Sequence, residues 1–90
     1  MMKAQQGFTI EQAKAVATEI GLDFERVSFD LEQFRRGMNV ELEHGSQDPL
    51  TNVTNDDPMV TGKIAWAHLR EFPDYYDRLK AMEAEAERGA

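Results

Sequence analysis

The sequence predicts an all-α fold: a small single-domain bundle of about four helices, with a long polar loop between the second and third. Apolar residues recur three and four positions apart in four segments, which is the period of an amphipathic helix. Each segment is bounded by helix start or stop signals. A chain of 90 residues allows one domain, which we place at residues 8–88, after a flexible N-terminal segment at residues 1–7.

The first helix is predicted to begin after Thr9. Thr9 and Gln12 have the spacing of a capping box, in which each side chain bonds the other residue's backbone N–H. The apolar stripe of this helix comprises Ile10, Ala13, Val16, Ala17 and Ile20. Gly21 is the expected end, because glycine adopts the left-handed C-terminal conformation without a Cβ clash. A short connector with several apolar residues follows.

The second helix is predicted to begin after Asp30, which forms the same capping pattern with Gln33. Its stripe comprises Leu31, Phe34, Met38 and Leu42, and Gly45 is the expected end. Gly37 lies inside the helix at a cost of about 1 kcal/mol relative to alanine. The sequence leaves two explanations open: a second helix approaches closely at this glycine, or the helix bends there.

Residues 46–57 are polar and form the predicted long loop, in which Leu50 and Val53 are expected to contact the core. Asp57 followed by Pro58 is a strong helix start, because the aspartate caps and proline suits the first helical position. The third helix carries Val60, Ile64, Trp66, Ala67, Leu69 and Phe72.

Pro73 is predicted to end the third helix and to begin the fourth, so that the two form a corner. The apolar stripe of the fourth helix comprises Tyr75, Tyr76, Leu79, Met82 and Ala86. The glutamates near its end, Glu83, Glu85 and Glu87, are expected to form a solvated face.

Composition excludes several classes of function. The formal net charge of −7 opposes binding to nucleic acid or to an anionic membrane surface, both of which need clustered positive charge. The absence of cysteine excludes disulfides, thiolate metal sites and a cysteine nucleophile. The sequence also shows no signal-peptide pattern and no apolar run of the ~20 residues that span a membrane, so we expect a cytoplasmic protein.

Both histidines lie three positions from a carboxylate, which places each pair on one helix face: Glu41 with His44, and His68 with Glu71. If the second and third helices pack antiparallel, these four side chains could converge as a metal site. Carboxylate and imidazole ligands suit Fe, Mn or Zn. The alternative is a hydrogen-bond network that joins the two helices, which is the commoner role for such histidines.

Four aromatic residues, Trp66, Phe72, Tyr75 and Tyr76, lie near the predicted corner. They are candidates for a protein-interaction surface, although such residues more often complete the core of a small domain. No nucleophile elbow, phosphate-binding loop or dinucleotide fingerprint is present, so we assign no catalytic residue and expect a protein without enzymatic activity. The expected partner is another protein or a second copy of the chain.

Four blocks of the sequence, residues 37–45, 61–65, 68–69 and 73–76, carry a resemblance over roughly residues 8–85. Together they resemble a family of small uncharacterised domains of bacteria and tailed phages. A shorter form of that family resembles segments of phage head-maturation polyproteins, and it often has aspartate where this chain has Ala67. The resemblance implies a phage or prophage origin, with the host cytoplasm as location. It implies no activity. The interaction or accessory role is expected from the charge, the size and the lack of a catalytic motif.

Overall fold

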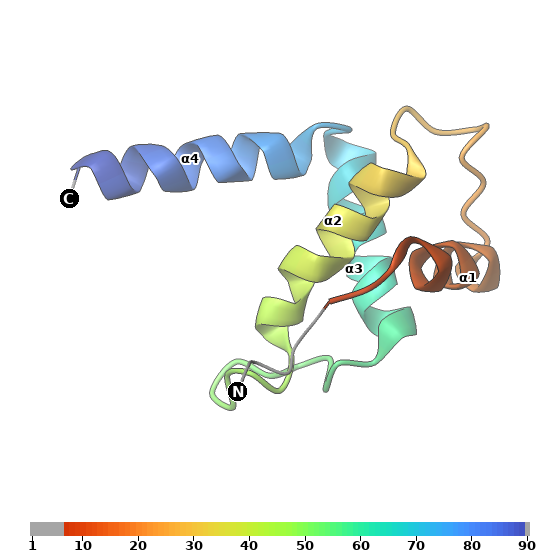
Figure 1. Ribbon diagram of the computed structural model, residues 1–90, viewed down its shortest axis with the longest axis horizontal. Coiled ribbons are helices and arrows are strands. Elements are labelled where there is room, and N and C mark those ends of the chain that lie inside the picture. Colours follow the sequence, from red (N-terminus) through yellow and green to blue (C-terminus); the bar gives the residue numbers. More distant parts are fainter. Residues whose placement is uncertain (1–6, 90) are drawn as a thin grey trace.

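The computed structural model describes residues 7–89, and within that range the chain forms four α-helices and no strand (Figure 1). The helices are α1 (Ile10–Ile20), α2 (Leu31–Glu41), α3 (Pro58–Glu71) and α4 (Tyr75–Gly89), and the 3₁₀ helix η1 (Leu42–His44) extends α2 by one tighter turn. The predicted all-α class is confirmed. The predicted flexible segment 1–7 lies, apart from Gly7, outside the described residues. No helix within this range is long and apolar enough to cross a membrane.

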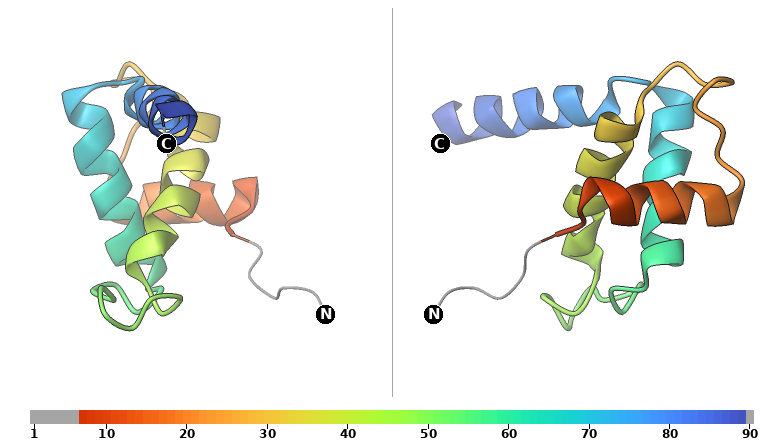
Figure 2. Two further views of the ribbon diagram at one scale, coloured as in Figure 1. Left: turned by 90° about the vertical axis from the view of Figure 1, so that its left-hand side faces the viewer. Right: turned by 45° about the vertical axis from the view of Figure 1, so that its right-hand side comes forward.

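Three helices form the body of the molecule. α2 and α3 run antiparallel beside each other and share the most extensive contact between any two elements, while α1 lies across both (Figures 1 and 2). α4 leaves the end of α3 at a sharp corner and extends away from the other helices (Figure 1). The body therefore contacts only the beginning of α4.

The predicted helix boundaries follow from caps that the structure contains. Thr9 and Asp30 both form complete capping boxes, and Asp57 accepts hydrogen bonds from the backbone N–H groups of Met59 and Val60. Gly21 ends α1 with a φ of 82°, the left-handed conformation that glycine adopts without strain. The connector between α1 and α2 contains no helix, although it contributes two buried side chains to the core.

The core lies where α1, α2 and α3 meet. Its buried apolar residues are Ala13, Val16, Ala17, Leu22, Phe29, Phe34, Met38, Leu42, Ala65, Leu69 and Tyr76. Gly62 brings α1 against α3, since a Cβ at this position would lie 2.6 Å from Val16 Cγ1.

The structure decides between the two explanations for Gly37. A Cβ at Gly37 would lie 2.5 Å from Cε2 of the Tyr76 ring, and the next nearest ring atoms are 3.1 Å away. Because Gly37 has no side chain, the ring of Tyr76 lies directly against the backbone of α2. Gly37 therefore permits the close approach of α4.

The contact predicted for Leu50 and Val53 is wrong, since their exposed fractions are 93% and 75%. Polar groups hold the segment between η1 and α3 instead. The backbone N–H and the hydroxyl of Ser46 both donate to the carboxylate of Asp56, the former at 3.0 Å. The N–H groups of Val53 and Thr54 donate to the carbonyl oxygen of His44. These bonds fix the loop without burial of its apolar side chains.

Candidate functional site

The candidate site is centred on Glu41, the last residue of α2, whose exposed fraction is only 4%. The hydroxyl of Tyr76, from α4, donates to Glu41 Oε2 at 2.6 Å. The Nε2 atom of His68, from α3, lies 3.6 Å from the same oxygen, and Nε2 of His44 lies 3.8 Å from Oε1. The buried carboxylate of Glu41, from α2, therefore meets three side chains, one each from α3, α4 and η1.

Helix geometry explains how these groups meet. Because Cα–Cβ bonds tilt toward the N-terminus of a helix, the side chain of Glu41 leans toward the preceding turn, which contains Gly37. The ring of Tyr76 lies on Gly37, so its hydroxyl projects toward the carboxylate. His68 belongs to α3, which runs antiparallel to α2, so its side chain leans in the opposite direction to that of Glu41. The two side chains therefore lean toward each other.

Aromatic stacking completes this arrangement. The rings of His68 and Tyr75 are stacked, with centroids 4.2 Å apart and an interplanar angle of 9°. Tyr76 meets both rings edge-on, at 6.3 Å from His68 and 4.9 Å from Tyr75. These are favourable geometries for aromatic pairs. We call Glu41, His44, His68, Tyr75 and Tyr76 the Glu41 cluster.

The electrostatics of the cluster keep Tyr76 as a hydrogen-bond donor. Burial, and then the hydrogen bond to Glu41, hold the pKa of the Tyr76 phenol well above its ordinary value. The raised pKa favours the protonated phenol, which is the form that donates to Glu41. A buried carboxylate needs such donors, because an unsatisfied charge away from water is costly.

The structure brings together three of the four residues predicted to bind Fe, Mn or Zn. Glu41, His44 and His68 converge, whereas Glu71 is exposed, and its side chain makes no hydrogen bond or ion pair within residues 7–89. Glu71 lies outside this group, and the carboxylate near His68 is that of Glu41 from α2. The described part of the chain contains no group of three or more histidine, cysteine, aspartate or glutamate side chains that could hold a metal ion. The metal site stays a prediction.

The sequence interpretation missed the bond between Tyr76 and Glu41, although one signal was present. Glu41 lies three positions after Met38 and seven after Phe34, which places its carboxylate on the apolar stripe of α2. A charged residue on such a stripe is expected to be buried with a partner. The spacing alone does not name that partner, which lies 35 residues further along the chain.

The four aromatic residues predicted as an interaction surface have different environments. Tyr76 belongs to the core, and Trp66 and Tyr75 are partly buried against it. The Trp66 indole Nε1 is shielded and has no hydrogen-bond partner among the described residues. Phe72 is the most exposed of the four, at 49%. Phe72 is therefore available at the surface, together with part of Trp66 and part of Tyr75.

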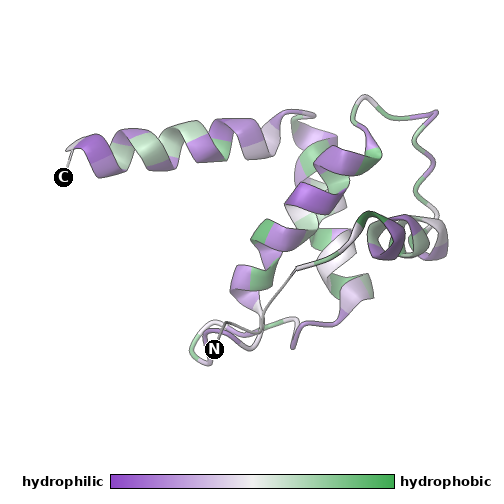
Figure 3. Ribbon diagram, viewed as in Figure 1, coloured by the Kyte–Doolittle hydropathy of each residue, from purple (hydrophilic) through white to green (hydrophobic). Residues whose placement is uncertain are grey.

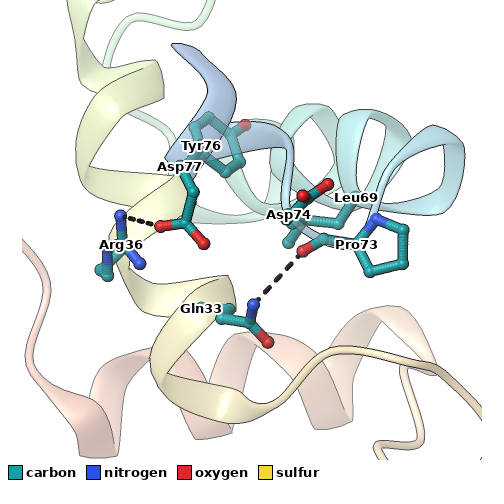
Figure 4. Close-up of a pocket in the computed structure, with 7 residues that line it drawn as sticks. All are labelled: Gln33, Arg36, Leu69, Pro73, Asp74, Tyr76 and Asp77. Carbon is teal, nitrogen blue, oxygen red and sulfur yellow. Dashed lines mark hydrogen bonds and ion pairs between the residues drawn. The ribbon is translucent and has the colours of Figure 1, made fainter. Parts of the chain in front are cut away.

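The first turn of α4 is held to α2 by polar contacts (Figure 4). The guanidinium of Arg36 lies 2.9 Å from the carboxylate of Asp77, and the Gln33 amide donates to the Pro73 carbonyl oxygen at 3.3 Å. Together with the Tyr76 bond to Glu41, these contacts fix where α4 begins and in which direction it points.

Beyond this attachment, α4 carries an apolar surface that the other described elements cover only in part: Tyr75 and Leu79 are partly buried against the core, whereas Phe72 and Met82 are exposed. Phe72, Tyr75, Leu79 and Met82, with Arg78 at their edge, line a shallow groove of about 220 Å³. We call the four apolar residues the α4 face. Every residue from 80 to 89 is exposed, Met82 at 61%. Figure 3 shows that apolar positions recur along α4 beyond the body.

Comparison with curated proteins and with solved structures gave no match. Comparison with protein families gave one, a family described as "Protein of unknown function (DUF5661)", whose model matches residues 13–85. The matched range includes the whole Glu41 cluster and the α4 face. Because the match extends over most of its length, this chain belongs to the DUF5661 family of proteins of unknown function.

Proposed function

We propose that the chain is a non-enzymatic protein-interaction or accessory domain, and that it contacts its partner through the α4 face. One observation carries the proposal: α4 leaves the three-helix body and presents an apolar stripe on a helix whose residues from 80 to 89 are all exposed (Figure 1). Apolar side chains grouped on one exposed face are typical of interaction surfaces.

Helix energetics support the same proposal. An isolated helix of fewer than about 12–15 residues is only marginally stable in water, and most helical stability in proteins comes from packing of an apolar face. The outer turns of α4 have little such packing within this chain. Burial of Leu79 and Met82 against a partner would supply it.

The Glu41 cluster supports this function indirectly, as an anchor for α4. Its hydrogen bond and stacked rings join Tyr75 and Tyr76, the first two residues of α4, to α2 and α3. The α4 face is thereby presented in a fixed direction, which reduces the entropy lost on binding.

The test uses immobilised protein and three variants of the full chain: the unchanged sequence, Met82→Glu and Leu50→Glu. Met82 and Leu50 are both exposed apolar residues, but only Met82 belongs to the α4 face. A protein from the host lysate that binds the unchanged chain and Leu50→Glu, and not Met82→Glu, would support docking through α4. Equal binding to all three variants would refute it.

We also propose a phage or prophage context, supported only by the resemblance of the four sequence blocks to domains of tailed phages. The position of the gene tests this proposal. Neighbouring genes for capsid or head-maturation proteins would support it, and a chromosomal position remote from any prophage would refute it.

A further inference from the structure

We propose that the partner of the α4 face is a second copy of this chain, paired with the first through antiparallel α4 helices. This inference rests on the proposed function and names the partner. The observations that carry it are the spacing of the apolar residues along α4, the separation of charge between its two halves, and a guanidinium group beside the face whose two terminal nitrogens have no hydrogen-bond partner within residues 7–89.

The apolar spacing is that of a helix pair. Tyr75, Leu79, Met82 and Ala86 follow one another at intervals of four, three and four residues, which is the heptad pattern of two-stranded coiled coils. In an antiparallel arrangement Leu79 lies opposite Met82 of the second copy, and Tyr75 lies opposite Ala86. A large residue thus faces a small one at each end of the pair, which favours close packing.

The charges of α4 separate along its length. Residues 75–82 contain Asp77, Arg78 and Lys80 and have a net charge of +1. Residues 83–89 contain three glutamates and Arg88 and have a net charge of −2. Antiparallel pairing places the positive half of each helix against the negative half of the other, whereas parallel pairing places like against like. Charge therefore selects the antiparallel orientation.

One ion pair follows from this register. Arg78 and Glu85 are seven residues apart, so they lie on the same side of α4. In the antiparallel pair Arg78 lies diagonally across the seam from Glu85 of the second copy, about 3 Å from level along the helix axis. Two-fold symmetry makes this contact twice. Glu85 is exposed, and among the described residues its carboxylate pairs only with Arg88, at 3.2 Å.

The guanidinium of Arg78 is already positioned for this contact. Its Nε atom donates to Asp74 at 2.8 Å, and its carbon Cζ lies 5.4 Å from the centre of the Phe72 ring. These contacts hold the side chain at the edge of the α4 face. The two terminal nitrogens have no hydrogen-bond partner within residues 7–89, so they can donate to an incoming carboxylate.

Sedimentation equilibrium of the full chain tests the pairing. The unchanged chain is expected to change from monomer to dimer within about 10 µM to 1 mM, the range of weak specific complexes. Met82→Glu should lower the association constant at least about tenfold. Leu50→Glu is the matched control and should leave the constant unchanged, because Leu50 lies in the loop. A chain that stays monomeric at millimolar concentration would overturn the proposal.

Charge exchange tests the register. Glu85→Arg and Arg78→Glu should each weaken association about threefold or more, because each replaces an attraction by a repulsion at both symmetric contacts. The double variant should restore association to within about twofold of the unchanged chain. Restoration by Glu83→Arg in place of Glu85→Arg would instead indicate parallel helices, and would overturn the proposed orientation.

The lack of cysteine permits an independent measurement of orientation with single spin labels. In the antiparallel pair the two copies of position 87 are about 20 Å apart along the helix axis, while the two copies of position 81 lie almost level. Glu87→Cys labels should therefore be much further apart than Ala81→Cys labels. Similar distances at both positions would refute the antiparallel pair.

These experiments separate the failure of this inference from that of the proposed function. If the chain is monomeric but Met82→Glu abolishes binding of a host protein, the interaction function stands and the second copy is the wrong partner. If Met82→Glu changes neither self-association nor binding of a host protein, both proposals fail.

Discussion

Tyr76 shows how a single residue fixes the direction of an entire helix. Its ring occupies the space left by Gly37, and its hydroxyl satisfies the buried carboxylate of Glu41. The first contact depends on shape and the second on hydrogen bonding, so substitutions that remove one of them can separate their contributions.

Tyr76→Phe keeps the ring and removes the hydrogen bond. We expect the free energy of unfolding to fall by about 1–3 kcal/mol, the cost of a buried acceptor that loses its donor. The matched control is Tyr75→Phe, since the Tyr75 hydroxyl makes no hydrogen bond within residues 7–89 and the stacked ring remains. It should change the free energy by no more than about 0.5 kcal/mol. Urea titration measures both values, and equal effects would contradict a special role for Tyr76.

Gly37→Ala tests the shape of the same contact. Alanine improves helix propensity by about 1 kcal/mol, but its Cβ would overlap a ring that the Glu41 hydrogen bond holds in place. We expect the overlap to dominate, since overpacking costs about 1–3 kcal/mol, and the variant to melt at a lower temperature.

Gly89→Ala is the control for this glycine, because a Cβ at Gly89 meets no atom within 4 Å among the described residues. It should leave thermal stability unchanged or slightly raised. A Gly37→Ala variant as stable as Gly89→Ala would show that Tyr76 is free to move away.

At the scale of elements, the helices could be predicted from sequence, but the contacts that hold the loop could not. Helix caps depend on residues three positions apart, so Thr9, Asp30 and Asp57 identified their helix starts correctly. The loop depends on Asp56, which has a positive φ of 64° and bonds Ser46 ten residues earlier. Leu50 was expected to hold the loop because it is apolar. The loop is instead held by hydrogen bonds between polar groups, and Leu50 is exposed.

The loop should make stability depend on pH through Asp56. The hydrogen bonds from the hydroxyl and the backbone N–H of Ser46 hold the pKa of Asp56 below its ordinary value. The ionised form is thus favoured in the folded protein, and its stabilisation is present above the unfolded-state pKa of about 3.9. This stabilisation is lost as the pH falls through the lower pKa of the folded state.

Asp56→Asn checks this dependence by chemical denaturation between neutral and acidic pH. The variant should be less stable than the unchanged chain near neutrality, and the difference should vanish at the acidic end of the range. Ser46→Ala removes only one of the two hydrogen bonds, so it should reproduce part of the effect. If the unchanged chain remains more stable than Asp56→Asn at a pH where Asp56 is protonated, the stabilisation comes from the backbone conformation of the loop and not from the charge of Asp56.

At the scale of the whole molecule, the packing of the helices decides which side chains contact Glu41, and the spacing of residues in the sequence does not. The pairing of Glu41 with His44 could be predicted, because both lie on one helical turn. The contacts of Glu41 with His68 and Tyr76 depend on how α2, α3 and α4 pack, and no local pattern states this. The same uncertainty made Glu71 an equal candidate in the sequence, although it lies at the surface.

Because α4 points away from the other helices, the molecule consists of a body that is expected to fold without the outer turns of α4, and of those outer turns, which have little packing within the chain. Among the described residues, a chain truncated after Met82 loses only the exposed residues 83–89, whereas one truncated after Asp74 also loses Tyr76, the donor to Glu41. At a concentration low enough for monomers, the first should unfold within about 0.5 kcal/mol of the full chain, as surface changes usually do. The second should lose about 3–5 kcal/mol, the cost of removing a large buried aromatic side chain.

Near millimolar concentration, only the full chain among these three chains should gain stability by mass action, because association stabilises only the folded state. If the truncation after Met82 is as damaging to the monomer as the truncation after Asp74, the outer turns of α4 belong to the folded body and are not a separate surface for docking.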